Sequence, residues 1–366
     1  MTAARLVARC VRGLEPAVST EILQSGSASI TSLAHREVVY RTPAADAPYP
    51  RTADDVFLLA ERRGDIGPYK SDLAALAELA HAVDLDALER ERRARGGPRG
   101  FAGIDISASY LGRRTYNRYD IEDAIGPVLA QRLGVPYHAR RNGTAPPPDY
   151  SGWRLTLDGT HTTLLLRLGT RPAHRRSYKR ATVPGTLHPP LAAAMALLAD
   201  LQPGQRIMDP CCGAGTLLIE AHHVVPGTTL LGFDLDPEAR RAAEANAAGT
   251  APLRIERADA GGLPVADGSV DRVLCNPPWE GQVAAGGRLA ARPERWWREL
   301  ARVLTGQGRA VVLVPDARGL THALAHGLEP THVRQVSLSG RRPLMVRLER
   351  TRSPGPRRTA HRGKGG

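Results

Sequence analysis

The pattern of apolar and polar positions changes half-way along the chain, and its second half predicts an α/β domain. Short apolar runs there are followed by helical patterns, which is the order of strand–helix units in a parallel sheet. The predicted strands lie at 205–208, 230–236, 253–260 and 270–275. One predicted helix begins at Thr216, and another spans 238–248. We therefore expect a Rossmann-like domain of mainly parallel strands at 171–350.

The first half of the chain predicts an α+β arrangement instead. The elements expected at 1–65 are strands at 6–11, 36–42 and 56–61 and a helix at 14–23, an order that resembles a small ferredoxin-like unit. The elements expected at 66–170 are helices at 73–83 and 121–133 and strands at 103–110, 153–158 and 162–168. We interpret this half as an appended module with a function of its own; the alternative is an inert structural extension.

A glycine-rich turn, Asp209-Pro210-Cys211-Cys212-Gly213-Ala214-Gly215-Thr216, leads from the first strand of the α/β domain into a helix. Gly213 and Gly215 allow backbone torsions and a close ligand approach that a Cβ atom would block. The free N–H groups at the start of that helix suit a carboxylate as well as a phosphate. Because the chain lacks the full G-x-G-x-x-G spacing and has no G-K-[ST], a dinucleotide or a nucleoside triphosphate fits this turn poorly.

Acidic residues follow the next two strands, at the edge where open α/β sheets bind their ligands. Asp234 ends an apolar run about 20 residues after the turn, a position from which an acid holds ribose hydroxyls. Asp259, with Ala260 beside it, is expected to accept a hydrogen bond from an adenine amine. Asp236 is predicted to cap the following helix instead. A nucleotide-binding domain with unrelated chemistry is the alternative.

The fourth strand ends in Asn276-Pro277-Pro278-Trp279, a turn suited to a planar amine. Such an amine is a poor nucleophile, because its lone pair is delocalised into the aromatic ring. The Asn276 side-chain oxygen and the Pro277 carbonyl can accept its two N–H groups and direct the lone pair at a sulfonium methyl group. Trp279 can stack on the base, a contact worth about 1–3 kcal/mol. Asn276, Pro277 and Trp279 are therefore candidate catalytic residues, although an isolated Asn-Pro-Pro would indicate only a loop.

The formal net charge of +13 points to a polyanionic partner. From Arg350 onward the chain carries six basic residues and no acid, and we expect a disordered tail at 351–366. Any single charge run can be merely a solvated surface, but the basic clusters recur through the first half and its junction with the second. The residues expected to contact RNA are Arg113, Arg114, Arg175, Arg176, Lys179 and Arg180.

Other ligand classes and locations are not favoured by the sequence. The four cysteines form no C-x-x-C pair, and His322 and His326 share a helical face without a nearby acid or cysteine pattern, so no metal site is expected. No apolar run approaches about 18 residues and the N-terminus lacks a signal-peptide core. We expect a cytoplasmic monomer that binds no membrane.

The order of these pieces is similar to that of the THUMP-domain RNA guanine-N2 methyltransferases. The stretches that carry the resemblance, besides the two motifs above, are SASYLGRRTYNRYDIEDAIGPVLAQRLG at 107–134, HRRSYKR at 174–180 and PGTLHPPLA at 184–192. Cys211 and Ala214 stand where that family usually has an aromatic residue and a serine. The resemblance implies that a THUMP domain at 66–170 holds the tRNA acceptor end and that the α/β domain binds S-adenosyl-L-methionine.

By this resemblance, the target base is expected at 276–279 and the product is N2-methylguanosine in tRNA. The residues expected to bind the cofactor are Asp209, Cys211, Gly213, Gly215, Asp234, Asp259, Ala260 and Asn276. Alternative targets are ribosomal RNA, adenine, or a protein glutamine, whose amide suits the same Asn-Pro-Pro-aromatic logic. A glutamine-modifying enzyme would lack the basic features of the N-terminal half. An RNA-binding protein with a relic catalytic domain is a further alternative, but a relic should have lost Asp234 or Asn276.

Overall fold

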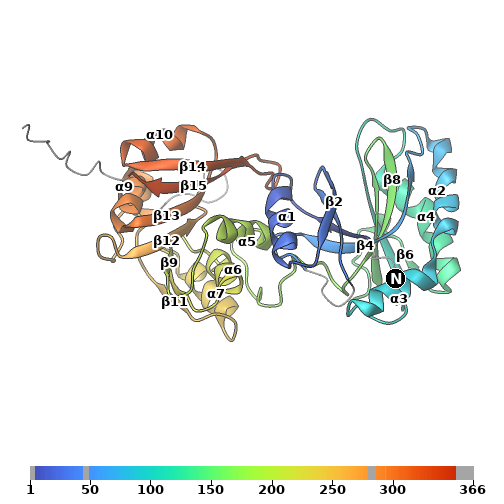
Figure 1. The fold of residues 1–366 in the computed structure, drawn as a ribbon, viewed down its shortest axis with the longest axis horizontal. Coiled ribbons are helices and arrows are strands. Elements are labelled where there is room, and N and C mark those ends of the chain that lie inside the picture. The colour runs from blue at the N-terminus through green and yellow to red at the C-terminus, as the bar shows by residue number, and fades with distance from the viewer. Residues whose placement is uncertain (1–4, 44–48, 279–285, 293, 352–366) are drawn as a thin grey trace, which may run out of the picture. The chain divides into compact units, whose positions relative to one another are not determined.

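The computed structural model describes residues 5–43, 49–278, 286–292 and 294–351. The chain divides into two compact units, residues 1–176 with 189–194 and residues 177–188 with 195–366 (Figure 1). Helix α5 (Pro189–Leu198) contributes residues to both units. Within the described residues, none of the helices combines the length and the hydropathy that a membrane span requires.

The first unit is built on an eight-stranded sheet with the order β2-β3-β1-β4-β8-β7-β5-β6. Its strands are β1 (Arg5–Arg9), β2 (Ser29–Ala34), β3 (Glu37–Arg41), β4 (Asp55–Gly64), β5 (Ile104–Tyr110), β6 (Tyr137–His138), β7 (Ser151–Leu157) and β8 (His161–Arg167). β5 pairs in parallel with β6 and β7, and the other pairs are antiparallel. The pairing of β4 with β8 brings strands from the regions expected at 1–65 and 66–170 into this one sheet.

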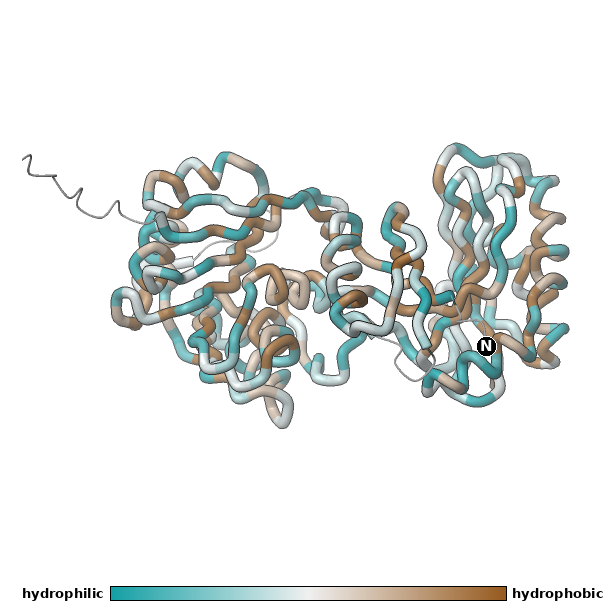
Figure 2. The backbone as a smooth tube through the Cα atoms, viewed as in Figure 1, coloured by the Kyte–Doolittle hydropathy of each residue, from teal (hydrophilic) through white to brown (hydrophobic). Residues whose placement is uncertain are grey.

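The helices of this unit include one with a clear amphipathic pattern, α2 (Ala75–Ala82). They are α1 (Glu15–Gln24), the 3-10 helix η2 (Lys70–Ala74), α2 (Ala75–Ala82), α3 (Leu85–Ala94), α4 (Arg118–Leu133) and the 3-10 helix η3 (Arg140–Asn142). In α2, Leu76, Leu79 and Ala80 are buried at helical spacing, whereas Glu78 is exposed. In Figure 2, α2 and α4 accordingly carry both brown and teal stretches along their turns.

Capping residues set the start of two helices, and the hydrophobic pattern alone does not locate either start. α4 begins at Arg118, ahead of the predicted 121, because the Asn117 side chain accepts from the first backbone N–H groups and Asp120 accepts from the Asn117 N–H. α3 has no counterpart among the predicted elements; Asp84 caps it by accepting from the Ala87 N–H at 2.9 Å. β2 is also unpredicted, because its residues are mostly exposed and lack apolar alternation.

The second unit is built on a seven-stranded sheet with the order β11-β10-β9-β12-β13-β15-β14. Its strands are β9 (Arg206–Asp209), β10 (Thr229–Phe233), β11 (Leu253–Glu256), β12 (Val270–Cys275), β13 (Leu304–Val314), β14 (Leu328–Gln335) and β15 (Leu344–Arg350). Beside α5, its helices are α6 (Thr216–Val224), α7 (Pro237–Ala247), α8 (Gly287–Ala291), α9 (Glu294–Val303) and α10 (Arg318–Ala325). Strands β9 to β13 are parallel, and β15 is antiparallel to both of its neighbours. The predicted Rossmann-like α/β fold of mainly parallel strands is thus confirmed for this unit, with β13, β14 and β15 added to the four predicted strands.

A large apolar core fixes the central strands of this sheet. It includes Val270, Val273 and Cys275 of β12, together with Trp296 and Trp297 of α9. The two tryptophan rings meet edge to face, with centroids 4.4 Å apart. Because β12 is anchored on this side, the residues that follow Cys275 start from a rigid strand end.

Candidate active site

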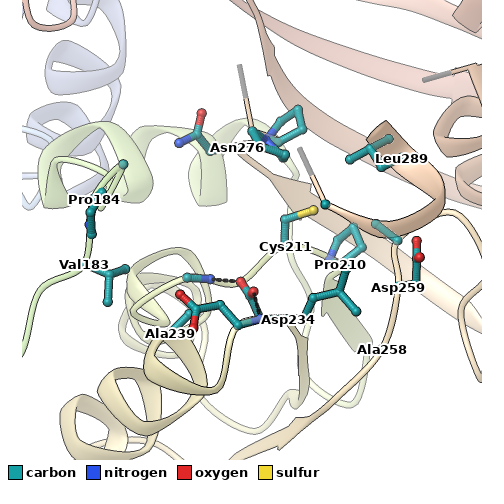
Figure 3. Close-up of a pocket in the computed structure, with 18 residues that line it drawn as sticks. Val183, Pro184, Pro210, Cys211, Asp234, Ala239, Ala258, Asp259, Asn276 and Leu289 are labelled. Atoms are coloured by element: carbon teal, nitrogen blue, oxygen red, sulfur yellow. Dashed lines mark hydrogen bonds between the residues drawn. The ribbon is translucent and has the colours of Figure 1, made fainter. Parts of the chain in front are cut away.

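A cavity of about 330 Å³ lies at the carboxyl ends of the parallel strands of the second unit (Figure 3). Residues that follow β9, β10, β11 and β12 line it, so four loops far apart in the sequence meet there. The expected site residues along its wall are Cys211, Gly213, Asp234, Asp259, Ala260, Asn276 and Pro277. Asp209 lines a small adjoining hollow of about 40 Å³, and Gly215 lines neither. Trp279 lies outside the described residues.

The glycine turn has the backbone shape that its sequence predicts. Gly213 and Gly215 have φ angles of +51° and +77°, which side chains of L-residues rarely adopt. Gly215 precedes α6, and a Cβ atom there would lie 3.2 Å from the Cβ of Ala243, so this glycine also lets α6 and α7 pack closely. The Cys212 N–H donates to the Phe233 carbonyl at 2.9 Å, which ties the turn to the end of β10.

Asp234 follows β10 directly and connects two loops of the cavity wall. Its carboxylate accepts from the Gly213 N–H and from the Asp236 N–H, both at 2.9 Å. Figure 3 shows the Asp234 side chain at the cavity with one of these hydrogen bonds dashed. Since a carboxylate has about four acceptor sites, it keeps lone pairs for a ligand. Asp236 caps α7 by accepting from the Glu238 N–H at 2.8 Å, as its position before Pro237 predicts.

Asp259 is oriented by backbone groups on both of its oxygens. The Gly261 N–H donates to one oxygen at 2.8 Å, and the Arg288 N–H donates to the other at 2.7 Å. Arg288 lies at the start of α8, where a Cβ atom on Gly287 would come within 2.2 Å of the Asp259 carboxylate. The sequence interpretation missed α8 and its cavity residue Leu289, although the paired Gly286-Gly287 was a usable signal of close backbone approach.

Asp209 is a buried acid behind the glycine turn. Its side chain is 1% exposed and accepts from the Cys211 N–H at 3.1 Å. Burial raises the pKa of Asp209 to about 8, and the negative charge of Asp234 adds to the rise. Burial also raises the pKa of the neighbouring Cys275 thiol well above its ordinary value.

Asn276, Pro277 and Pro278 continue from β12 along the same cavity. Among the described residues, the Asn276 side-chain amide has no hydrogen-bond partner, so its oxygen and nitrogen are both available to a ligand. Burial would make an unsatisfied amide costly, but Asn276 is only half-buried and faces the cavity. This arrangement gives the cavity one region rich in acids and one with a free amide and prolyl carbonyls.

The segment before α5 forms a further part of the cavity wall, which the sequence did not predict. Val183, Pro184 and Gly185 line the cavity, and Thr186 closes their turn by accepting from the Val183 N–H at 2.9 Å. Pro184-Gly185 is a turn signal, but nothing in its spacing connects it to the glycine turn that follows.

The residues expected to contact RNA differ in how they are held. Arg113 is exposed, whereas the Arg114 side chain is 5% exposed and binds both oxygens of Asp65, at 2.7 and 2.5 Å. Arg114 also donates to the Gly67 carbonyl at 2.7 Å, and Asp65 holds the pKa of Arg114 above its ordinary value. The geometry gives Arg114 a role in fixing its own loop.

The basic residues at the junction of the two units show the same contrast. Arg176 donates to the Ala173 and Arg51 carbonyls, both at 2.5 Å, within the first unit. Arg175 and Arg180 are exposed. Lys179 is half-buried, and burial lowers the pKa of its ammonium group.

Comparisons with known proteins agree with this geometry. Residues 176–343 match the RMKL-like methyltransferase domain family. The chain is 32% identical over 282 residues to a tRNA (guanine(6)-N2)-methyltransferase of Thermus thermophilus, covering 74% of this chain and 80% of that protein. The chain belongs to the tRNA guanine-N2 methyltransferase family.

Solved structures extend the likeness along the whole chain. TrmN from Thermus thermophilus superimposes with a TM-score of 0.72 at 27% identity, covering 94% of this chain and 99% of that one. A protein described as a methyltransferase and crystallised with SAH superimposes with a TM-score of 0.67 at 16% identity, covering 96% of this chain and all of that one (100%). The second likeness concerns the fold alone, whereas the first also supports the family assignment.

Proposed function

We propose that this enzyme transfers a methyl group from S-adenosyl-L-methionine to the exocyclic amine of a guanine in tRNA, giving N2-methylguanosine. The observation that carries the proposal is that Asp234, Asp259 and Asn276 line one cavity, although each follows a different strand. The names of the relatives, tRNA (guanine(6)-N2)-methyltransferases of Thermus thermophilus and of mouse, supply the substrate class.

The residues of the cavity fit an adenosyl methyl donor. Asp234 keeps free lone pairs beside the Gly213 N–H and would hold the two ribose hydroxyls. Asp259 would accept from the adenine amine, and its two backbone donors fix the carboxylate for that contact. The open backbone at Gly213, where a Cβ atom would meet nothing within 4 Å, leaves room for the methionine end.

The bound donor supplies a methyl group already activated by its sulfonium. The protein therefore needs to bind, orient and exclude water, and positioning contributes most of the rate. The Asn276 oxygen and the Pro277 carbonyl would each accept one N–H of the guanine amine, and this draws the nitrogen lone pair out of conjugation. Trp279 would stack on the base, which must leave any helical stack to reach the cavity.

The N-terminal unit is proposed to bind the tRNA. We assign residues 1–65 to a ferredoxin-like region and 66–170 to a THUMP domain, with the methyltransferase domain at 171–350 and a basic tail at 351–366. The exposed Arg113 and Arg175 would contact phosphates, whereas Arg114 and Arg176 support the backbone that presents them.

The proposal is tested by transfer of labelled methyl groups from S-adenosyl-L-methionine to unmodified tRNA, followed by mass spectrometry of the nucleosides. We expect N2-methylguanosine to be the labelled product. Label in N6-methyladenosine, or in a protein side chain but not in tRNA, would contradict the proposed substrate. Transfer to ribosomal RNA alone would retain the chemistry and overturn the choice of tRNA.

A further inference from the structure

The segment 177–188, which joins the two halves of the sequence, is part of the second unit and is anchored on its helices. Tyr178 is buried in a small apolar cluster with Ile219 of α6 and Ala247 of α7. Its hydroxyl group donates to Glu220 Oε1 at 2.8 Å, and the Glu220 side chain is fully buried. The first anchor of the segment is thus a packed aromatic ring with a satisfied polar end.

Asn246 of α7 provides the second anchor. Its Oδ1 accepts from the backbone N–H groups of Arg180 and Ala181, at 2.7 and 2.9 Å. Its Nδ2 donates to the carbonyls of Ala181 and Ala214, both at 2.9 Å. A primary amide has two donors and two principal acceptor sites, so these four hydrogen bonds use the side chain completely.

The partners of Asn246 lie in two segments next to the cavity wall, and Asn246 itself lies on a third, α7. Ala214 lies between Gly213 and Gly215 in the glycine turn. α7 itself starts beside Asp234, and the segment from Arg180 leads within a few residues to the cavity-lining Val183–Gly185 turn. One side chain therefore fixes the position of this turn relative to the glycine turn and α7.

The surroundings of Asn246 argue against a merely tolerated polar residue. It is 1% exposed, and the other buried residues of α7 are the alanines Ala239, Ala242, Ala243 and Ala247. An aliphatic residue would satisfy packing on such a face, whereas a buried amide is destabilising unless its hydrogen bonds are made. The complete set of partners indicates that the amide is selected for what it holds.

We propose that Asn246 is a positioning residue that holds the 180–185 segment over the methyl-donor cavity and so sets donor affinity. The inference rests on the proposed function, because it assigns the cavity to S-adenosyl-L-methionine. Asn246 touches only protein, and its effect on the donor passes through Val183, Pro184 and Gly185.

Two variants and a matched control separate this role from general stability. Asn246→Leu removes all four hydrogen bonds. Asn246→Asp keeps the oxygen that accepts from Arg180 and Ala181 but loses both donors, and Glu244→Gln changes an exposed residue of the same helix. We expect Asn246→Leu to weaken binding of S-adenosylhomocysteine by about 10- to 100-fold, since buried backbone groups lose their partners. Asn246→Asp should also weaken binding, because its second oxygen would face the Ala181 and Ala214 carbonyls without a hydrogen to donate. Glu244→Gln should not weaken it, and KM for the methyl donor should rise more than kcat falls.

Cleavage by trypsin measures how firmly the segment is held, even without a ligand. Lys179 and Arg180 are trypsin sites, and the Arg180 N–H is bound by Asn246. Cleavage after these residues should be faster in Asn246→Leu than in the control, measured as fragment masses at a temperature where both proteins are folded. In the unaltered protein, S-adenosylhomocysteine should slow this cleavage but not cleavage after the exposed Arg318 of α10.

The outcomes distinguish the positioning role of Asn246 from the assignment of the cavity to S-adenosyl-L-methionine. If the unaltered protein binds no S-adenosylhomocysteine, the proposed function fails, while cleavage of the ligand-free variants still decides the anchoring role. If the unaltered protein binds it and Asn246→Leu matches Glu244→Gln in affinity and in cleavage after Lys179 and Arg180, the positioning role is wrong. Should Asn246→Leu not fold, absence of ligand protection at Lys179 and Arg180 in the unaltered protein would overturn it.

Discussion

The charge of Asp234 should contribute more to donor binding than that of its exposed neighbour Asp236, and Asn substitutions of the two test this directly. Asp234→Asn removes one negative charge from the cavity wall and replaces one acceptor oxygen by a donor. Asp236→Asn removes the same charge nearby but keeps the cap of α7, since asparagine caps helices about as well as aspartate. The pair therefore differs in position and not in net charge.

The magnitude follows from the hydrogen bonds of Asp234. Its carboxylate already accepts from the Gly213 and Asp236 N–H groups, which hold it in place, and two ribose hydroxyls would use the remaining lone pairs. Hydrogen bonds to charged groups are worth about 1.5–3 kcal/mol and neutral ones about 0.5–1.5 kcal/mol. Weakening two of them should cost about 2–3 kcal/mol, which is about a 30- to 160-fold rise in Kd.

Calorimetric titration of S-adenosylhomocysteine into both variants measures this difference. We expect the large loss in Asp234→Asn and less than about a threefold change in Asp236→Asn, whose exposed charge is screened by solvent. Thermal unfolding of each variant provides the control for folding. Equal losses in the two variants would mean that general charge matters and not a ribose contact, and a larger loss in Asp236→Asn would move the ribose site to that residue.

Three further predictions concern the chemical step, pH and RNA. Asn276→Ala should lower kcat about 10²–10³-fold in single-turnover transfer, with donor affinity unchanged. Trp279→Phe should keep most of the activity, because its ring can still stack on the base. Normal turnover in Asn276→Ala would mean that other residues activate the amine. The pKa of Asp209 is about 8 in the folded protein and 3.8 for an ordinary aspartate, so between these pH values the folded state holds a proton that the unfolded chain releases. The free energy of unfolding should therefore fall as pH rises from 3.8 to about 8. Denaturant unfolding of Asp209→Asn at several pH values should lack this contribution to the pH dependence. Arg113→Ala should reduce the salt dependence of tRNA binding by about 0.7–0.9 in log–log slope without changing Tm. Arg114→Ala should instead destabilise the protein by about 1.5–3 kcal/mol in denaturant unfolding, because the half-buried Asp65 loses its charged hydrogen-bond partner. Lower stability in Arg113→Ala with an altered salt dependence only in Arg114→Ala would contradict these roles.

The second half of the fold was predictable because its apolar runs are short and end in recognisable side chains. β11 and β12 lie within their predicted stretches, β9 and β10 each extend one residue beyond theirs, and α7 is placed to within one residue at each end. No strand was predicted at β13, β14 or β15, and α8 was missed as well. β13 pairs with β12 and β15, both distant from it in the sequence, and β14 joins the sheet only through β15. Local patterns do not encode which strand lies beside which.

Charge clusters were a weaker guide than strand ends. Arg113 and Arg114 are adjacent and identical in sequence, yet one is exposed and the other forms a half-buried ion pair with Asp65. Asp65 is 49 residues away from Arg114, so no local pattern could separate the two arginines. Composition indicates a basic protein. Which arginines are available to a polyanion depends on the side chains that each one contacts in the folded structure.

The position of β12 explains why two motifs separated by some sixty residues can serve one reaction. From β9 the chain proceeds outward to β10 and then β11, and it returns to the opposite side of β9 as β12. The glycine turn and Asn276 thus follow adjacent parallel strands, at the point where the strand order reverses, which is where open α/β sheets form their ligand crevices. Had β12 been added beyond β11, Asn276 would lie three strands from the glycine turn, about 14 Å away at the usual spacing of strands, too far for one amine to meet the bound methyl group. The order of strands, more than either motif alone, brings the glycine turn and Asn276 to one cavity.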